Sequence, residues 1–105
     1  MASKPPYTVR YVPIADAQIE AALLWWVHNR DKAPDRLARE LDAALEQIAL
    51  VPTGGRRARL RAHTGVRRLL LPVCAYHLYY VVDDDAHEVR VVYFRHARRR
   101  PLRAK

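Results

Sequence analysis

The spacing of hydrophobic residues predicts a strand and then a helix at the start of the chain. Between residues 7 and 12 the side chains alternate with a period of two, which is typical of a strand, and Pro13 is expected to end it. Asp16 is then expected to cap or charge the start of a helix that runs to about Asn29. The apolar stripe of this helix consists of Ala15, Ile19, Ala22, Leu23, Trp26 and Val27. This stripe is expected to face a core.

A second helix follows a break over residues 29–34. Pro34 fits the first helical position, and Asp35 favours the positive end of the helix. The apolar stripe of the second helix consists of Leu37, Leu41, Ala44, Leu45 and Ile48. Pro52 and the glycines after it stop the helix. The short break predicts that the two helices pair as an antiparallel hairpin.

The second half of the chain is predicted to be a set of strands. Residues 56–64 form a basic connection that holds an irregular strand or a turn. Strands are expected over residues 66–71, 75–82 and 88 to about 95, and residues 83–87 form the last turn. The element order is therefore β-α-α-β-β-β. This order predicts an α+β fold in which a helical hairpin packs on one face of a mostly antiparallel sheet and leaves the other face partly open.

Size, charge and cysteine content narrow the class of protein. The 105 residues fit a single domain over 1–105, with 1–6 and 98–105 as ends that are flexible or ordered by a partner. Nineteen Lys and Arg against eleven Asp and Glu give a net charge of +8, which favours nucleic acid, an acidic protein or an anionic surface as partner. Cys74 is the only cysteine, so no intramolecular disulfide is expected, in keeping with a reducing cytoplasm. No segment has the roughly 18 apolar residues of a membrane span, so no membrane partner is expected.

Metal and cofactor sites are not expected. The three glycines, at 54, 55 and 65, exclude a Walker or dinucleotide-binding motif. Asp83, Asp84 and Asp85 occupy a strand-linking turn, and they lack the glycine and glutamate of a calcium loop. The five histidines show no zinc spacing.

The C-terminal part of the chain resembles a known family. Val81 and Val82 precede the acidic turn, a strand follows over 88–93, and His96-Ala97-Arg98 closes it. Other parts of the resemblance are residues 25–30 at the end of the first helix, Ala33-Pro34 at the junction, residues 49–52 followed by Gly54 and Gly55, and residues 65–67 at the start of a strand. This ordered set, which covers about residues 7–101, is similar to the RelE/ParE family of type II toxin–antitoxin (plasmid stabilisation) systems and is closer to its ParE branch.

The resemblance implies a toxin that a cognate acidic antitoxin binds and silences in a hetero-oligomer in the cytoplasm. The antitoxin's extended or helical C-terminal segment would wrap the toxin. Arg67, Arg68, Arg95 and Arg98 would lie near the antitoxin or the target. Trp25 and Trp26 cannot share one helical face, so Trp26 is expected in the core and an exposed Trp25 would anchor a partner.

Three functions remain open. ParE-like relatives inhibit DNA gyrase by binding and use no catalytic residues, and the two long helices favour this branch. RelE-like relatives cleave mRNA on the ribosome; here the acid, the base and the phosphate clamp would come from Arg67, Tyr80, Arg95, His96 and Arg98. Strand alternation, however, puts Arg95 and His96 on opposite faces. The third function is a basic nucleic-acid-binding module in which arginines between 56 and 68 contact phosphates.

Overall fold

The computed structural model describes residues 5–98, so most of the expected flexible or partner-ordered ends lies outside the described residues. Its elements, in chain order, are β1 (Thr8–Tyr11), α1 (Pro13–Asn29), α2 (Arg36–Leu50), a 3-10 turn (Pro52–Gly54), β2 (Arg56–Arg57), β3 (Val66–Leu71), β4 (Tyr76–Asp83) and β5 (Glu88–His96). The predicted element order is confirmed, and the irregular strand expected after residue 56 is β2.

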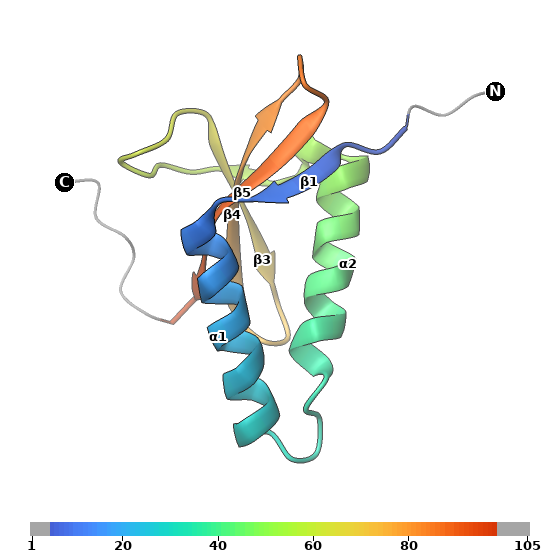
Figure 1. The fold of residues 1–105 in the computed structure, drawn as a ribbon, viewed down its shortest axis with the longest axis vertical. Helices are drawn as coiled ribbons and strands as arrows, with labels where there is room; N and C mark the ends of the chain where they lie inside the picture. Colours follow the sequence, from blue (N-terminus) through green and yellow to red (C-terminus); the bar gives the residue numbers. More distant parts are fainter. Residues whose placement is uncertain (1–4, 99–105) are drawn as a thin grey trace.

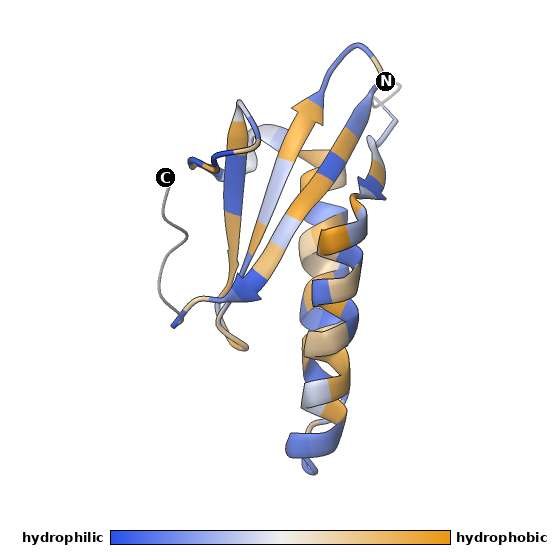
Figure 2. Ribbon diagram, turned by 60° about the vertical axis from the view of Figure 1, so that its left-hand side comes forward, coloured by the Kyte–Doolittle hydropathy of each residue, from blue (hydrophilic) through white to orange (hydrophobic). Residues whose placement is uncertain are grey.

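The strands form one five-stranded sheet in the order β1-β5-β4-β3-β2. β1 runs parallel to β5, and the other neighbouring strands are antiparallel. α1 and α2 run in opposite directions and lie on the same side of this sheet (Figures 1 and 2). The predicted α+β fold, with a helical hairpin on one face of a mostly antiparallel sheet, is therefore confirmed.

The helix boundaries differ from the prediction at both N-termini. α1 begins at Pro13, because the fixed φ of proline suits the first helical turn. Asp16 does not cap the helix, but it lies in the first turn, so the alternative that it charges the helix start is confirmed. α2 begins at Arg36, two residues after Pro34, and Asp35 is its N-cap residue without a side-chain capping bond. Proline at the start of a helix thus marks the boundary of α1 more closely than that of α2.

The helices bury the predicted stripes with one exception. The buried residues are Ala15, Ile19, Ala22 and Trp26 on α1, and Leu37, Leu41, Ala44 and Ile48 on α2. Leu23 and Leu45 are partly buried and pack against the same core. Val27 was wrongly assigned to the stripe and is 53% exposed. At about 100° per residue it lies about 120° around the helix from Ala15, whereas Trp26 lies about 20° away.

A β-bulge in β5 decides which of its side chains face the helices. Tyr80 lies opposite Val91 and Tyr79 lies opposite Tyr93, so Val92 is the extra residue. Val89 and Val91 belong to the helix-side core before the bulge, and Phe94 belongs to it afterwards. The face of every residue after Val92 is therefore the reverse of what simple alternation from the start of β5 gives.

The face of the sheet opposite the helices is partly covered. Val66, Tyr79 and Val92 are buried there in a second small core. Ala58 and Leu60, which follow β2, pack against this cluster. The segment after β2 therefore lies across the sheet, and the face that was expected to be partly open has a covered centre.

Candidate functional site

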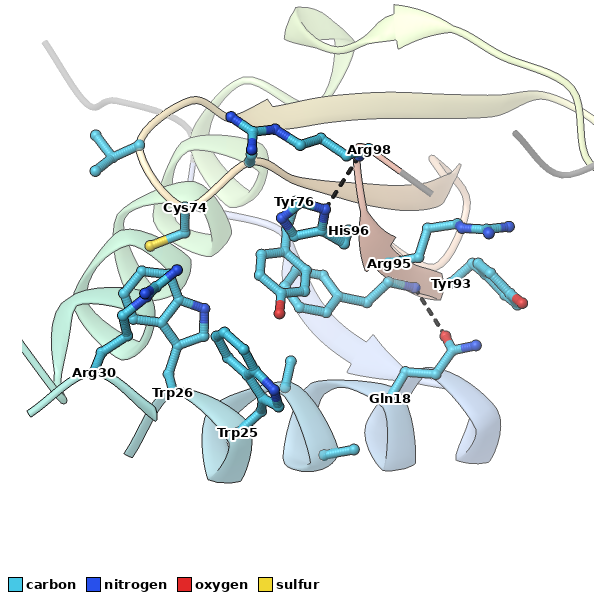
Figure 3. Close-up of a pocket in the computed structure, with 15 residues that line it drawn as sticks. Gln18, Trp25, Trp26, Arg30, Cys74, Tyr76, Tyr93, Arg95, His96 and Arg98 are labelled. Atoms are coloured by element: carbon cyan, nitrogen blue, oxygen red, sulfur yellow. Dashed lines mark hydrogen bonds between the residues drawn. The ribbon is translucent and has the colours of Figure 1, made fainter. Parts of the chain in front are cut away.

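A groove of about 650 Å³ lies between α1, the loop that joins β3 to β4, and the end of β5 (Figure 3). The side chains that give it chemical character are Trp25, Arg30, Tyr76, Arg95, His96 and Arg98. No carboxylate lies among the described residues that line it. The groove is thus aromatic and positively charged.

The groove exists at this place because β5 extends beyond the end of its neighbour β1. β1 pairs with β5 only from Glu88 to Val91, so the rest of β5 has no strand beside it on that edge. α1 takes the place of a strand: the Gln18 Oε1 atom accepts a hydrogen bond of 2.9 Å from the backbone N–H of Phe94 (Figure 3). A long helix beside a free strand edge leaves the space that forms the groove.

One wall of the groove is built from α1. Trp26 is buried, whereas Trp25 is 47% exposed. The guanidinium carbon of Arg30 lies 5.3 Å from the ring centroid of each tryptophan, which is cation–π distance. The predicted division of the two tryptophans between core and surface is confirmed, and Arg30 holds the exposed indole beside the groove.

The opposite wall carries His96 from the end of β5. The His96 ring lies 5.1 Å from that of Tyr76 in an edge-on arrangement, and Tyr76 stacks on Phe94 at 4.9 Å. The backbone N–H of Arg98 donates a 3.2 Å hydrogen bond to His96 Nδ1, so the neutral imidazole carries its proton on Nε2 (Figure 3). His96 is thereby fixed in orientation as well as in tautomer.

Arg95 and His96 lie on opposite faces of the sheet, as alternation predicts. Arg95 is opposite His77 in β4, and His96 is opposite Tyr76. Both nevertheless line the groove, because the groove wraps around the free edge of β5. The structure thus brings together Trp25, Arg95, His96 and Arg98 from the residues singled out in the sequence.

Tyr80 and Arg67 lie elsewhere and hold a turn. The Tyr80 hydroxyl donates to the Pro52 carbonyl oxygen at 2.7 Å and accepts from the Gly55 N–H at 2.9 Å. Arg67 donates to the carbonyl oxygens of Gly55 at 2.9 Å and Thr53 at 3.3 Å. Four residues of extended strand, about 13 Å, separate Tyr80 from Tyr76 at the groove.

The environment of Tyr80 suits a structural role. Its side chain is fully buried, and burial raises the pKa of the hydroxyl, an effect that the Gly55 N–H and the positive charge of Arg67 oppose. The position of Gly55 is equally constrained, because a Cβ atom there would collide with the Tyr80 hydroxyl. Tyr80, Gly55 and Arg67 together close the end of the sheet that lies beyond α2.

Arg68 lies neither at the groove nor at the turn but on the sheet face away from the helices. It lies opposite Tyr79 in the adjacent strand, and Tyr79 is in the small core on the face away from the helices. The sequence-selected residues therefore divide into the groove, the turn anchor and the far face of the sheet.

The sequence analysis missed three residues of the groove: Gln18, Arg30 and Tyr76. A signal existed for Arg30, since it follows Trp26 by four positions on a helix, which places the two side chains on one face. Gln18 and Tyr76 gave none: the contact of Gln18 depends on where β1 stops beside β5, and the contacts of Tyr76 depend on the register of β4 against β5.

The floor of the groove is closed by the loop between β3 and β4. The Glu40 carboxylate of α2 accepts hydrogen bonds from the backbone N–H groups of Val73 and Cys74 at 2.9 and 2.8 Å. Cys74 is buried, and burial, with a further contribution from Glu40, raises the pKa of its thiol to about 11. The thiol is therefore protonated at neutral pH.

Residues 5–98 contain neither a cluster of metal-binding side chains nor a membrane-spanning helix. No group of three or more metal-binding side chains comes together in this part of the chain. None of its helices is long and apolar enough to cross a membrane.

Comparison with known proteins gives a consistent result. The fold is similar to that in the toxin–antitoxin complex RelBE2 from Mycobacterium tuberculosis, with a TM-score of 0.62 and 23% identity over 99% of this chain and 100% of that one. It is also similar to that in the chromosomal ParDE toxin–antitoxin system from P. aeruginosa, with a TM-score of 0.70 and 15% identity over 86% of this chain and 95% of that one. No curated protein sequence gave a significant match.

The family assignment rests on the sequence as well as on the fold. A family model for the ParE toxin of the type II toxin-antitoxin system parDE matches residues 9–101, which span every helix and strand described above except for Thr8 at the start of β1. The resemblance found in the sequence is thereby confirmed. The chain belongs to the ParE toxin family of type II toxin–antitoxin systems.

Proposed function

We propose that this toxin works in the cytoplasm as one domain that inhibits DNA gyrase by binding it, and that a cognate acidic antitoxin silences it. In this proposal the groove beside α1 is a binding surface and not a catalytic centre. Its contact residues are Trp25, Arg95 and Arg98, which all line the groove.

The observation that carries the proposal is that Tyr80 and Arg67 are already hydrogen-bonded to the backbone of residues 52–55. RNA cleavage needs a proton donor, a proton acceptor and cations around one phosphate. The Tyr80 hydroxyl is instead buried between Pro52 and Gly55, and Arg67 donates to the same turn. Two members of the candidate catalytic set thus stabilise the fold, about 13 Å along β4 from the groove.

The character of the groove supports binding of a protein. An exposed tryptophan held by a stacked arginine is a typical anchor at protein interfaces, because it buries a large area with little loss of side-chain entropy. Arg30, Arg95 and Arg98 would attract an acidic segment, and no carboxylate among the described lining residues opposes this. The antitoxin and gyrase would then compete for overlapping parts of one surface.

Ribosome-dependent mRNA cleavage is the second candidate function. His96 favours it, since its tautomer is fixed and Arg95 and Arg98 lie beside it in the groove. In this alternative His96 Nε2 would exchange the proton and the two arginines would hold the phosphate.

Two assays with the same purified chain separate the candidates. One follows supercoiling of relaxed plasmid by gyrase, and the other follows cleavage of mRNA on programmed ribosomes. We expect loss of supercoiling, intact mRNA, and full recovery when the antitoxin is added. The His96→Gln variant is the matched control: it should still inhibit gyrase, because the proposal gives His96 no proton to transfer. Any loss should be no larger than that expected for one contact of a binding surface. Cleaved mRNA with unaffected gyrase would refute the proposal.

A further inference from the structure

Acidic and basic residues are segregated along the chain. Residues 47–82 contain no Asp or Glu, but they contain six arginines. In the structure this stretch forms the 3-10 turn, β2, β3, nearly all of β4 and the segment that crosses the far face of the sheet. Carboxylates are instead found on the helices, in the connection between them and around the turn between β4 and β5.

Five arginines gather on the sheet face away from the helices, and we call them the arginine surface: Arg56, Arg59, Arg61, Arg68 and Arg95. Arg56 lies directly opposite Arg68, so their side chains share this face. Arg95 belongs to the same face, two strands away. Arg59 and Arg61 are exposed on the segment whose Ala58 and Leu60 pack onto it.

The arginine surface differs from the opposite edge of the same face. There Glu88 binds both Arg10, at 2.7 Å, and Arg90, at 2.9 Å. Within residues 5–98 no carboxylate forms an ion pair with any member of the arginine surface. At that edge Glu88 offsets part of the positive charge of two arginines, whereas the arginine surface leaves its guanidinium groups available to an external anion.

We propose that the arginine surface binds the phosphate backbone of duplex DNA without base specificity. All five cations are arginines, whose planar guanidinium groups bind phosphate oxygens in pairs. Strand spacing puts the Cα atoms of Arg68 and Arg95 about 12 Å apart. A duplex carries one negative charge per roughly 1.7 Å of its axis, so a surface of this width meets several phosphates.

Side chains around these arginines favour a duplex over the other polyanions. Binding of a single strand normally uses exposed aromatic faces on which bases stack. Here Tyr79 is buried and packs edge-on against Tyr93 at 6.2 Å, so it offers no open ring face. An acidic peptide would need several apolar anchors, but Leu70 is the only exposed large hydrophobic residue that the described strands place on this face. Four others lie on α1: Ile14, Leu24, Trp25 and Val27.

This inference concerns the chain alone and does not rest on gyrase being its target. The test is the binding of a fluorescent 20-base-pair duplex of random sequence to the full-length chain between 50 and 200 mM salt, without gyrase. Two charge-matched double variants are compared: Arg59→Gln with Arg61→Gln on the arginine surface, and Arg36→Gln with Arg39→Gln on α2. All four arginines are exposed, and the basic C-terminal residues are common to every protein compared.

We expect the wild type and the α2 variant to share a steep dependence of log K on log salt. The slope should fall by about 0.9 for each arginine removed from the arginine surface, or about 1.8 for the double variant. A second double variant on the arginine surface, Arg68→Gln with Arg95→Gln, should reduce the slope by a similar amount. Because Arg68 and Arg95 lie on strands, this result would exclude a local change in the segment that carries Arg59 and Arg61. Equal losses in the α2 variant, no binding by the wild type at 50 mM salt, or tighter binding of single-stranded RNA or of polyglutamate would each overturn the proposal.

Discussion

The two ends of the helix-facing side of the sheet contain similar side chains but differ in what those side chains contact. At one end, which we call the closed end, the side chains of Tyr80 and Arg67 form hydrogen bonds with the backbone of residues 52–55. At the other end, which we call the open end, Trp25 is half exposed and the arginines line an open groove. A tyrosine and an arginine in the right order along a sequence therefore do not identify a site; their partners in the fold do.

Replacing the closed-end tyrosine should have the largest effect on stability. Tyr80→Phe keeps the ring but removes a hydroxyl that serves two buried backbone groups, one on Pro52 and one on Gly55. Leaving both groups unpaired should lower the free energy of unfolding by about 3 kcal/mol. Urea denaturation followed by circular dichroism measures the change.

Tyr93→Phe is the matched control for that experiment, because Tyr93 is half buried and none of the described hydrogen bonds uses its hydroxyl. It should change stability by less than about 0.5 kcal/mol. Equal losses in both variants would remove the distinction between the closed end and an ordinary tyrosine of the sheet.

At the open end the expected effect is on function. Trp25→Ala removes an exposed indole, so the free energy of unfolding should change by less than about 1 kcal/mol, while a typical interface anchor loses more than this on binding. We expect the toxin concentration that half-inhibits supercoiling to rise about tenfold, which corresponds to about 1.4 kcal/mol. Leu24→Ala is the control, because Leu24 is equally exposed on α1 but does not line the groove. If Leu24→Ala weakens inhibition as much, the contact surface is the outer face of α1 and not the groove.

The Arg67→Gln variant tests whether Arg67 belongs wholly to the closed end. It loses hydrogen bonds to the carbonyl oxygens of Thr53 and Gly55, one of them at an exposed site, and should lower the free energy of unfolding by about 1 kcal/mol. Growth arrest on induction should weaken only as far as the folded fraction falls. Wild-type stability combined with lost growth arrest would return Arg67 to the functional surface on which the family resemblance had placed it.

The fold was accessible from the sequence because hydrophobic period reports directly on burial. The stripes of both helices and the three long strands follow from it, and tertiary packing had only to choose the boundaries. Val27 was misplaced because α1 is apolar on both faces: Ile14, Leu24 and Trp25 are exposed on it as well. Where a helix has no polar face, periodicity loses its contrast and one position is easily assigned to the wrong side.

The site was less accessible, because it depends on two features that have no local signal. The bulge at Val92 puts Phe94 and His96 on the same face as Val91, where simple alternation would put Phe94 and His96 on the other face. The early end of β1 leaves the edge of β5 free for Gln18 and the groove. Pairing register between distant strands sets both features, so residues such as Tyr76 and Gln18 enter the site only after the sheet is assembled.

The smallest expected effect concerns the loop between β3 and β4, which forms the floor of the groove at the open end and shields Cys74 from solvent. Burial, with Glu40 adding to it, raises the pKa of the Cys74 thiol to about 11 from an ordinary value of 9.0. The folded chain thus holds this proton to higher pH than the unfolded chain does, so the stability contributed by Cys74 is complete below about pH 9 and declines as the pH rises towards 11. Because Cys74 is the only cysteine, alkylation by iodoacetamide reports on it alone, and the rate should stay low until well above pH 9. Glu40→Gln removes the charge and keeps an acceptor for one of the two loop N–H groups that Glu40 binds, so it should move the rise in rate to lower pH. A thiol that reacts at pH 8 as fast as an unfolded one would mean that solvent reaches below the groove and that the open end has no closed floor.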